Sequence, residues 1–286
     1  MDPWGRKMSK SLGNGIDAES VLECGAGGRT GSWKIKGPEG KQVTLQAKKI
    51  GSECFRFWKA ADAQVGDDFQ INPEDIEQKY FGVLTKLFNV ARFSSQFPVS
   101  SDLEQLPEGL QPEDEWILCE FQDVMTRVKQ AWEEIDIYTA SQLLKNFATG
   151  VLPSHWLEMV KSRLYDGDMA ASWTLHRIVR DLLDAFAPIC PFFSHYLSST
   201  LYKRSAVDAE TFPLISLDFD ANNWTSLTES VMQFNSEVWK LKKDEGLSLN
   251  SEISGVSIPE LIKLKLTTQK KINSIIKRTR EGGAEI

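Results

Sequence analysis

Residues 72–91 read Asn-Pro-Glu-Asp-Ile-Glu-Gln-Lys-Tyr-Phe-Gly-Val-Leu-Thr-Lys-Leu-Phe-Asn-Val-Ala. The stretch opens with Asn72, a residue type that caps helices, and Pro73 follows at what would be the first helical position. Apolar residues then recur every three or four positions, which places them on one face of a helix. They are Ile76, Tyr80, Val83, Leu84, Leu87, Phe88 and Ala91. The pattern predicts a long amphipathic helix with one apolar stripe to bury.

The same periodicity recurs along the rest of the chain. A kink is expected near Gly150 and Pro153, because proline removes a helical hydrogen bond, and Asp168 is a suitable cap for the helix after it. Helices that each carry one apolar stripe predict a helix bundle. The predicted helical spans are 116–132, 138–165, 169–186, 192–202, 224–244 and 259–279, with a strand-like segment over 247–257.

Residues 1–49 follow other patterns. Asp17 is a suitable N-cap for a short helix over 18–23. Between residues 24 and 49, apolar residues alternate with polar ones on both sides of Gly37-Pro38-Glu39-Gly40. Alternation around such a turn predicts a two-stranded hairpin.

Charge and composition limit the classes of protein to consider. The 286 residues carry 33 Lys and Arg against 40 Asp and Glu, and a net charge of -7 argues against indiscriminate binding of nucleic acid. Residues 236–286 hold ten basic and seven acidic residues, so this basic tail is the expected RNA-facing end. No apolar run approaches the roughly 20 residues that a membrane span needs. The four cysteines are too widely spaced to suggest a metal site, and no secretory signal is present, so the cytoplasm is the expected compartment.

Residues 7–11 read Lys-Met-Ser-Lys-Ser and carry the clearest chemical signal in the chain. Two ammonium groups three residues apart, flanked by hydroxyls and by Gly5 and Gly13, can wrap a triphosphate. They can also stabilise the charge that develops as pyrophosphate leaves. Lysine suits this task because it is a compact charge on a flexible stem. For an arbitrary pair of lysines at this spacing, the alternative is a basic loop that meets only solvent.

The longer string from Gly5 to Asn14, Gly-Arg-Lys-Met-Ser-Lys-Ser-Leu-Gly-Asn, closely resembles the second signature motif of class I aminoacyl-tRNA synthetases. Residues 16–22 are similar to the short helix after that motif. Residues 51–58, Gly-Ser-Glu-Cys-Phe-Arg-Phe-Trp, resemble the family's Gly-Ala-Asp-Ala-x-Arg-x-Trp segment. The chain departs from the pattern at two places. Glu53 stands where the family has aspartate, and residues 24–49 separate two pieces that are normally almost contiguous.

Downstream segments resemble the valine-specific branch of this family. They follow the family's order and, with the N-terminal motifs, cover nearly the whole chain. The isoleucine branch often carries extra cysteine-rich C-terminal elements, whereas the short tail here is archaeal-like. The matching segments are 86–93 (Lys-Leu-Phe-Asn-Val-Ala-Arg-Phe), 156–165 (Trp-Leu-Glu-Met-Val-Lys-Ser-Arg-Leu-Tyr), 187–192 (Ala-Pro-Ile-Cys-Pro-Phe) and 234–243 (Phe-Asn-Ser-Glu-Val-Trp-Lys-Leu-Lys-Lys).

The resemblance implies a mainly α fold, namely a helical bundle of the class I anticodon-binding type after a short catalytic-domain remnant with a β-hairpin insertion at 24–49. It implies domains over 1–72, 73–245 and 246–286, the last a small strand and helix unit. It also implies tRNA-Val as the partner of the bundle, in a monomeric enzyme without a metal site of its own. Lys7 and Lys10 are the implied catalytic residues. ATP, with the Mg²⁺ that it carries, is the implied ligand of Lys7, Ser9, Lys10 and Ser11.

The implied tRNA contacts are cations and aromatic residues on the helices. The cations could meet phosphates, and the aromatic rings could stack on unpaired bases. Helix-surface cations are more often only solvated, however, and aromatic residues at helical spacing usually pack in a core. The candidates are Lys86, Arg92, Trp156, Lys161, Arg163, Trp239, Lys240 and Lys243.

The family's other signature, His-x-Gly-His, does not occur in the sequence. In the family that motif meets the adenine and the reaction centre, so we expect the chain alone to be inactive. Two interpretations stay open. The chain is a portion of a valine-branch synthetase, or it is a non-catalytic tRNA-binding module or split-gene half that acts with a separate N-terminal half. A helical protein-interaction bundle with no RNA role would leave residues 7–11 unexplained.

Overall fold

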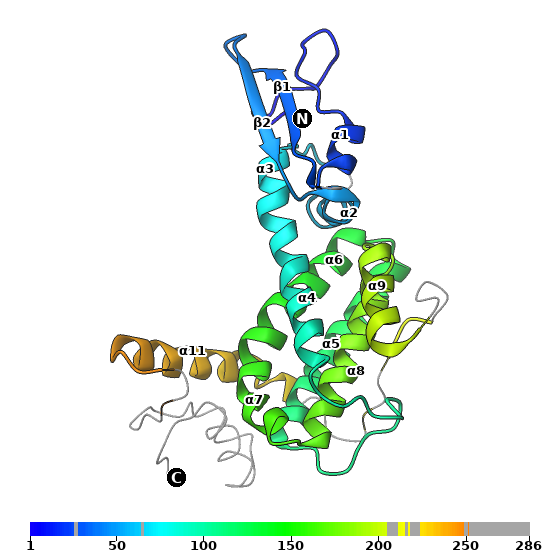
Figure 1. Cartoon of the computed structure of the whole chain (residues 1–286), viewed down its shortest axis with the longest axis vertical. Helices are drawn as coiled ribbons and strands as arrows, with labels where there is room; N and C mark the ends of the chain where they lie inside the picture. Colours follow the sequence, from blue (N-terminus) through cyan, green and yellow to red (C-terminus); the bar gives the residue numbers. More distant parts are fainter. Residues whose placement is uncertain are drawn as a thin grey trace. The chain divides into compact units, whose positions relative to one another are not determined.

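A two-stranded sheet and a series of helices make up the chain in this computed structural model (Figure 1). The mainly α fold expected from the sequence is therefore confirmed. No described helix is long and apolar enough to cross a membrane. The predicted helix over 259–279 and most of the strand-like segment over 247–257 lie outside the described residues. The structure describes residues 1–25, 28–63, 66–204, 211–214, 217, 224–248 and 251.

Among the described residues, the elements are helical apart from the hairpin of β1 and β2. Two segments, η2 and η3, are π-helical, so their hydrogen bonds join residues five apart. In chain order the elements are α1 (Ala18–Glu23), β1 (Gly31–Lys36), β2 (Gln42–Ala47), α2 (Gly51–Asp62), α3 (Pro73–Ile76), η2 (Glu77–Phe81), α4 (Gly82–Ser94), α5 (Pro112–Glu133), α6 (Ile137–Asn146), η3 (Phe147–Trp156), α7 (Leu157–Tyr165), α8 (Met169–Phe186), α9 (Pro191–Tyr202) and α11 (Thr228–Asp244).

The described residues form two compact units. The domain boundaries expected after residues 72 and 245 stay a prediction. Unit 1 draws on Met1–Asn89, Val128–Lys145 and Leu182–Phe212, and unit 2 draws on Val90–Arg127, Asn146–Asp181 and the described residues from Pro213 onward.

The hairpin of unit 1 has the pairing that the alternation predicted. Strands β1 and β2 run antiparallel, with Trp33 opposite Leu45 and Ile35 opposite Val43. Trp33, Ile35 and Leu45 are buried, whereas the residues between them are exposed. Successive side chains of a strand point to opposite faces, so one face of the hairpin packs into unit 1 and the other meets solvent.

The helix predicted from residue 72 onward begins where expected. The Asn72 side chain accepts a hydrogen bond from the Glu74 amide, and Pro73 is the first helical residue. Helical structure then continues through α3, η2 and α4 to Ser94, with the π-helical turn of η2 inside it. Most of the predicted apolar stripe is buried, but Phe88 is 36% exposed.

Aromatic packing and a helix cap hold α2 in unit 1. Phe57 of α2 is fully buried, with its ring centroid 5.1 Å from that of Tyr80 and 5.6 Å from that of Phe186. Glu53 of α2 accepts a hydrogen bond of 2.9 Å from the Phe193 amide in the first turn of α9. Glutamate here still supplies a carboxylate to a helix N-terminus, where negative charge is favourable. Burial nevertheless raises the pKa of Glu53, and the hydrogen bond and Arg56 offset only part of that rise.

The kink predicted near Gly150 and Pro153 is a π-helical segment, η3, which contains both residues. Proline has no N–H to donate and its ring collides with the carbonyl four residues earlier, so the helical hydrogen-bond register changes around it. Trp156 at the end of η3 is fully buried in unit 2. Phe121 of α5 packs on Phe147 of η3, with ring centroids 5.1 Å apart.

A buried ionic cluster ties three helices of unit 2 together. Arg163 of α7 is hydrogen-bonded to Glu113 (2.9 Å) and Asp114 (2.7 Å) of α5 and to Asp168 (2.8 Å). Asp168 also caps α8, as predicted, by accepting hydrogen bonds from the amides of Ala170 and Ala171. Glu113 and Asp114 are fully buried, so the guanidinium compensates carboxylates that water does not reach.

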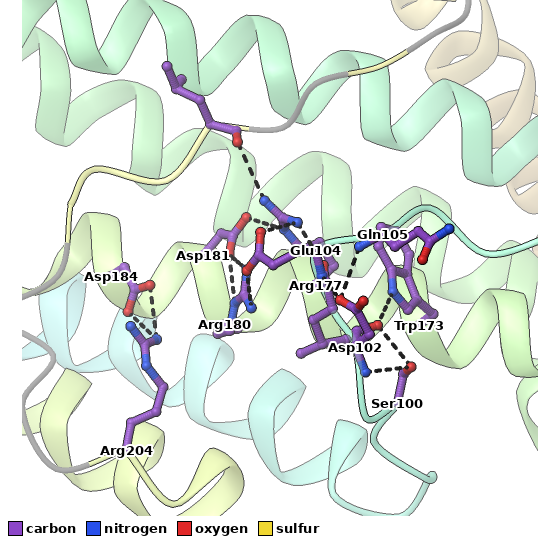
Figure 2. Close-up of polar contacts among 12 residues, drawn as sticks. Ser100, Asp102, Glu104, Gln105, Trp173, Arg177, Arg180, Asp181, Asp184 and Arg204 are labelled. Carbon is purple, nitrogen blue, oxygen red and sulfur yellow. Dashed lines mark hydrogen bonds and ion pairs between the residues drawn. The ribbon is translucent and has the colours of Figure 1, made fainter.

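A second ionic cluster joins helix α8 to residues 95–111, the segment that connects α4 to α5 (Figure 2). Arg177 bonds to Asp181 (2.6 Å) and to the Leu103 carbonyl (2.7 Å), and Arg180 bonds to Asp181 (2.9 Å) and Glu104 (2.7 Å). Arg177 is buried, and its bond to the Leu103 carbonyl pairs a backbone group that no helix or strand pairs in this segment.

Candidate functional site: the lysine loop and the helix-surface cations

Residues 7–13, here called the lysine loop, are held at their base by a buried pair of polar side chains. Asp2 and Asn14 are both fully buried, and the Asn14 amide donates to the Asp2 carboxylate over 2.9 Å. Asn14 also donates to the Lys7 carbonyl (3.2 Å) and accepts from the Ser9 amide (3.0 Å). Asn14 therefore joins the two ends of the loop.

Asp2 is an acceptor for several donors at once. Its carboxylate accepts from the amides of Trp4 (3.1 Å) and Arg6 (2.9 Å) and from the Arg6 guanidinium (2.8 Å). Burial alone would raise the pKa of Asp2, but hydrogen bonds from Asn14, Arg6 and Trp4 hold it below its ordinary value. Asp2 thus stays ionised and pairs with Arg6.

The hairpin braces the lysine loop from one side. The Arg6 guanidinium donates to the carbonyls of Lys36 and Gly37, at the end of β1. The Lys36 amide donates to the Gly13 carbonyl over 3.0 Å, so the far end of the loop is also tied to β1. The inserted hairpin is therefore structurally part of the loop's support.

The loop presents its two lysines to solvent. Lys7, Lys10 and Ser11 are exposed, and Ser9 is partly buried. The Ser9 and Ser11 hydroxyls lie 3.1 Å apart, and the Ser9 hydroxyl accepts from the Leu12 amide. The four residues singled out from the sequence thus lie on one short loop, with two exposed lysines beside two neighbouring hydroxyls. Such a surface can bind phosphate oxygens.

The candidate tRNA-binding cations divide by exposure. Lys161 is partly exposed and paired with Glu158 on the same helix. The exposed candidates are Lys86, Arg92, Lys240 and Lys243.

Two of the predicted tRNA contacts are wrong, because both residues are buried. Trp156 is 0% exposed, so its ring packs in the core of unit 2 and offers no face to a base. Arg163 is 4% exposed and its guanidinium is taken up by three carboxylates. Neither residue can contact RNA in this fold.

Two other aromatic residues of unit 2 lie nearer the surface. Trp239 is half-buried and stacks on His155, with ring centroids 5.4 Å apart. Tyr165, at the end of α7, is 64% exposed, with Phe93 and Phe97 at 6.0 and 5.6 Å from its ring. The rings of Phe93 and Phe97 thus pack against the exposed ring of Tyr165.

Sequence reasoning missed the residues that shape the loop. Asp2, Arg6 and Asn14 were not singled out, because no sequence pattern shows that their side chains bond to one another or, for Arg6, to the hairpin. The signal available in the sequence was the Leu-Gly-Asn that follows the lysines. All four cysteines are buried free thiols, and the described residues contain no cluster of three or more His, Cys, Asp or Glu able to hold a metal ion.

The chain belongs to a family of RNA-binding domains. Residues 114–257, half of the chain, match the family described as the anticodon-binding domain of tRNA ligase. This match confirms the family resemblance of the helical body and the function class expected from it.

The chain is similar to archaeal valine–tRNA ligases. The chain is 30% identical to that of Pyrobaculum aerophilum over 100% of its own length and 33% of the relative's. It is 29% identical to that of Aeropyrum pernix over 90% of its length and 29% of the relative's. The chain therefore spans about a third of the length of the curated relatives that it matches. In fold it is similar to the LeuRS of Agrobacterium radiobacter K84 in a complex with tRNA and LeuAMS, with a TM-score of 0.51 at 20% identity over 76% of this chain and 23% of that one.

Proposed function

We propose that this chain supplies the ATP-phosphate loop and the tRNA-binding body of a valine–tRNA ligase, which attaches valine to tRNA-Val at the expense of ATP. The observation that carries the proposal is the lysine loop, in which Asp2 and Asn14 close the base and leave Lys7 and Lys10 exposed. The same chain carries an anticodon-binding domain. The proposed setting is the cytoplasm, with the chain acting as a monomer or with a separate N-terminal half.

In this function Lys7 and Lys10 bind the phosphates of ATP, which brings its own Mg²⁺. Ser9 and Ser11 donate hydroxyl hydrogen bonds to the same oxygens. As the carboxylate of valine attacks the α-phosphorus, negative charge grows on the departing pyrophosphate. Ammonium groups already placed beside it stabilise that charge more than they stabilise bound ATP, which lowers the barrier.

The body of the chain binds the RNA through exposed cations and rings. Lys86, Arg92, Lys240 and Lys243 are the proposed phosphate contacts, with a lesser role for Lys161. Trp239, whose half-buried ring stacks on His155, is a proposed base contact. We expect no valyl-adenylate from the chain alone, because the sequence has no His-x-Gly-His segment to meet the adenine.

Binding of purified chain to transcripts of tRNA-Val and of a non-cognate tRNA of similar length tests the proposal. We expect tighter binding of tRNA-Val. With about three to five phosphate contacts, the logarithm of affinity should fall against the logarithm of salt concentration with a slope of about -2 to -4.5. Equal affinity for both transcripts and for heparin would argue against tRNA recognition. Valine-dependent ATP–pyrophosphate exchange by the pure chain would overturn the expectation that it is inactive alone.

A further inference from the structure

The hairpin of β1 and β2 has an exposed face that the proposed function does not use. Exposed residues alternate along both strands with residues that are buried or, at Val43, partly buried, and each exposed residue of β1 lies opposite an exposed residue of β2. This surface, here called the polar face, consists of Ser32, Lys34, Lys36, Gln42, Thr44 and Gln46.

The polar face is cationic and otherwise neutral. Lys34 and Lys36 form no ion pair with any described residue, and the other four side chains are hydroxyls and amides that can donate or accept hydrogen bonds. The one acidic residue of the hairpin, Glu39, is at the turn and pairs with Lys41 at 3.0 Å. The face has no apolar side chain. It therefore suits a polyanion rich in hydrogen-bond acceptors rather than an apolar protein surface or a membrane interior.

Both edges of the hairpin make hydrogen bonds to other segments of unit 1. On the β2 edge, the amide of Gln46 donates to Glu74 (3.1 Å), and the amide of Lys48 donates to Glu77. On the β1 edge, the Lys36 amide donates to Gly13. These bonds occupy part of each edge, so we take the polar face itself as the surface that a partner would approach.

The polar face borders the lysine loop. A Cβ atom placed on Gly13 would lie 3.7 Å from Cδ of Lys36, so the Lys36 stem runs beside the end of the loop. The Arg6 guanidinium, which also binds Asp2 at the base of the loop, donates to the Lys36 carbonyl. The Lys36 side chain of the polar face therefore lies beside the end of the lysine loop within unit 1.

We propose that the polar face binds the phosphodiester backbone at the acceptor end of tRNA. The proposal rests on the proposed function, in which the 3′ end of the RNA must reach an adenylate held beside the lysine loop. Lys34 and Lys36 stand two residues apart on one strand, a spacing of roughly 7 Å, which suits successive phosphates of one RNA strand. The hydroxyls and amides around them can contact phosphate oxygens and ribose hydroxyls.

The test uses the full chain with both lysines replaced, Lys34→Ala with Lys36→Ala. The ligand is a stem-loop RNA with only the acceptor stem and single-stranded 3′ end of tRNA-Val. We expect roughly tenfold weaker binding and a salt slope that is shallower by about 1.4 to 1.8, the value for two lost phosphate contacts. The control, Lys41→Ala with Lys129→Ala, removes the same charge at two exposed, ion-paired lysines and should bind like the wild type.

A second RNA separates this proposal from the proposed function. An anticodon stem-loop of tRNA-Val should bind the polar-face variant and the wild type equally. Unchanged binding of the acceptor RNA by the variant would overturn the polar-face proposal, as would an equal loss of affinity for the acceptor RNA and heparin. Failure of the wild type to prefer tRNA-Val would count against the proposed function. It would leave the comparison of variant and control on the acceptor RNA intact.

Discussion

Replacement of Arg163 by methionine should strongly destabilise unit 2. The guanidinium makes three hydrogen bonds of 2.7–2.9 Å to carboxylates, and Glu113 and Asp114 are fully buried. Methionine fills much of the space but leaves both carboxylates without a cation. Loss of one partner from such a cluster costs about 3–5 kcal/mol. For a unit of this size the thermal midpoint should fall by roughly 10 °C at pH 7.

The stability lost in Arg163→Met should be larger at pH 7 than at pH 5. Burial raises the pKa of Asp114 to about 6, even though Arg163 opposes that rise. An acid whose pKa is higher in the folded than in the unfolded state stabilises the fold while protonated, and that stability is lost as pH rises through the folded pKa. Without Arg163 the pKa should rise further. Part of the lost stability should therefore return between pH 7 and pH 5.

Urea unfolding followed by circular dichroism at pH 7 and pH 5 measures both effects. The matched control is Lys161→Met on the same helix, where a partly exposed lysine pairs only with Glu158. That change should cost less than about 1 kcal/mol. If Arg163→Met unfolds within 1 kcal/mol of the wild type at pH 7, or loses the same stability at both pH values, the ionic cluster does not hold the helices as we infer.

Two further substitutions test the fold and the loop. Asp114→Asn should reduce the change in stability between pH 5 and pH 7 by about 1 kcal/mol, because a neutral amide does not titrate; unfolding curves with an unaltered pH dependence would contradict the pKa shift. Asn14→Ala removes the hydrogen bonds that join Ser9 to the Lys7 carbonyl and should speed tryptic cleavage after Lys7 and Lys10 by roughly tenfold. The control is Asn89→Ala at an exposed position, which should be cleaved at the wild-type rate. If Asn14→Ala is also cleaved at that rate, the Asn14 hydrogen bonds do not hold the loop together.

Local sequence signals predicted much of the fold. Asp17 and Asn72 cap helices where a cap residue precedes an apolar stripe. Strict alternation specified the hairpin register, because a shift by one residue would turn Trp33 and Ile35 to solvent. These features depend on residues close together in the chain, so propensity and periodicity reveal them.

The remaining features depend on contacts between distant segments. Periodicity could not separate the solvated Lys161 from the buried Arg163 two residues away, because the carboxylates that hold Arg163 come largely from another helix. Nor could it show that Trp156 is in the core. At the candidate site, the motif predicted the lysines and serines. It did not predict the hydrogen bond between Asn14 and Asp2 or the one from Arg6 to the hairpin, because these depend on how the chain folds.

Valine charging in a reassembled enzyme tests the central claim most directly. The chain would be combined with a polypeptide that corresponds to the part of an archaeal valine–tRNA ligase preceding the lysine loop, and adenylate formation and valyl-tRNA-Val would be followed with rapid mixing. We expect the mixture to charge tRNA-Val. Lys10→Ala should slow adenylate formation by about 10²–10³, or ~3–4 kcal/mol, with little change in thermal stability. Failure to charge, or an unchanged adenylation rate in Lys10→Ala, would contradict the role given to the lysine loop and favour a non-catalytic tRNA-binding module.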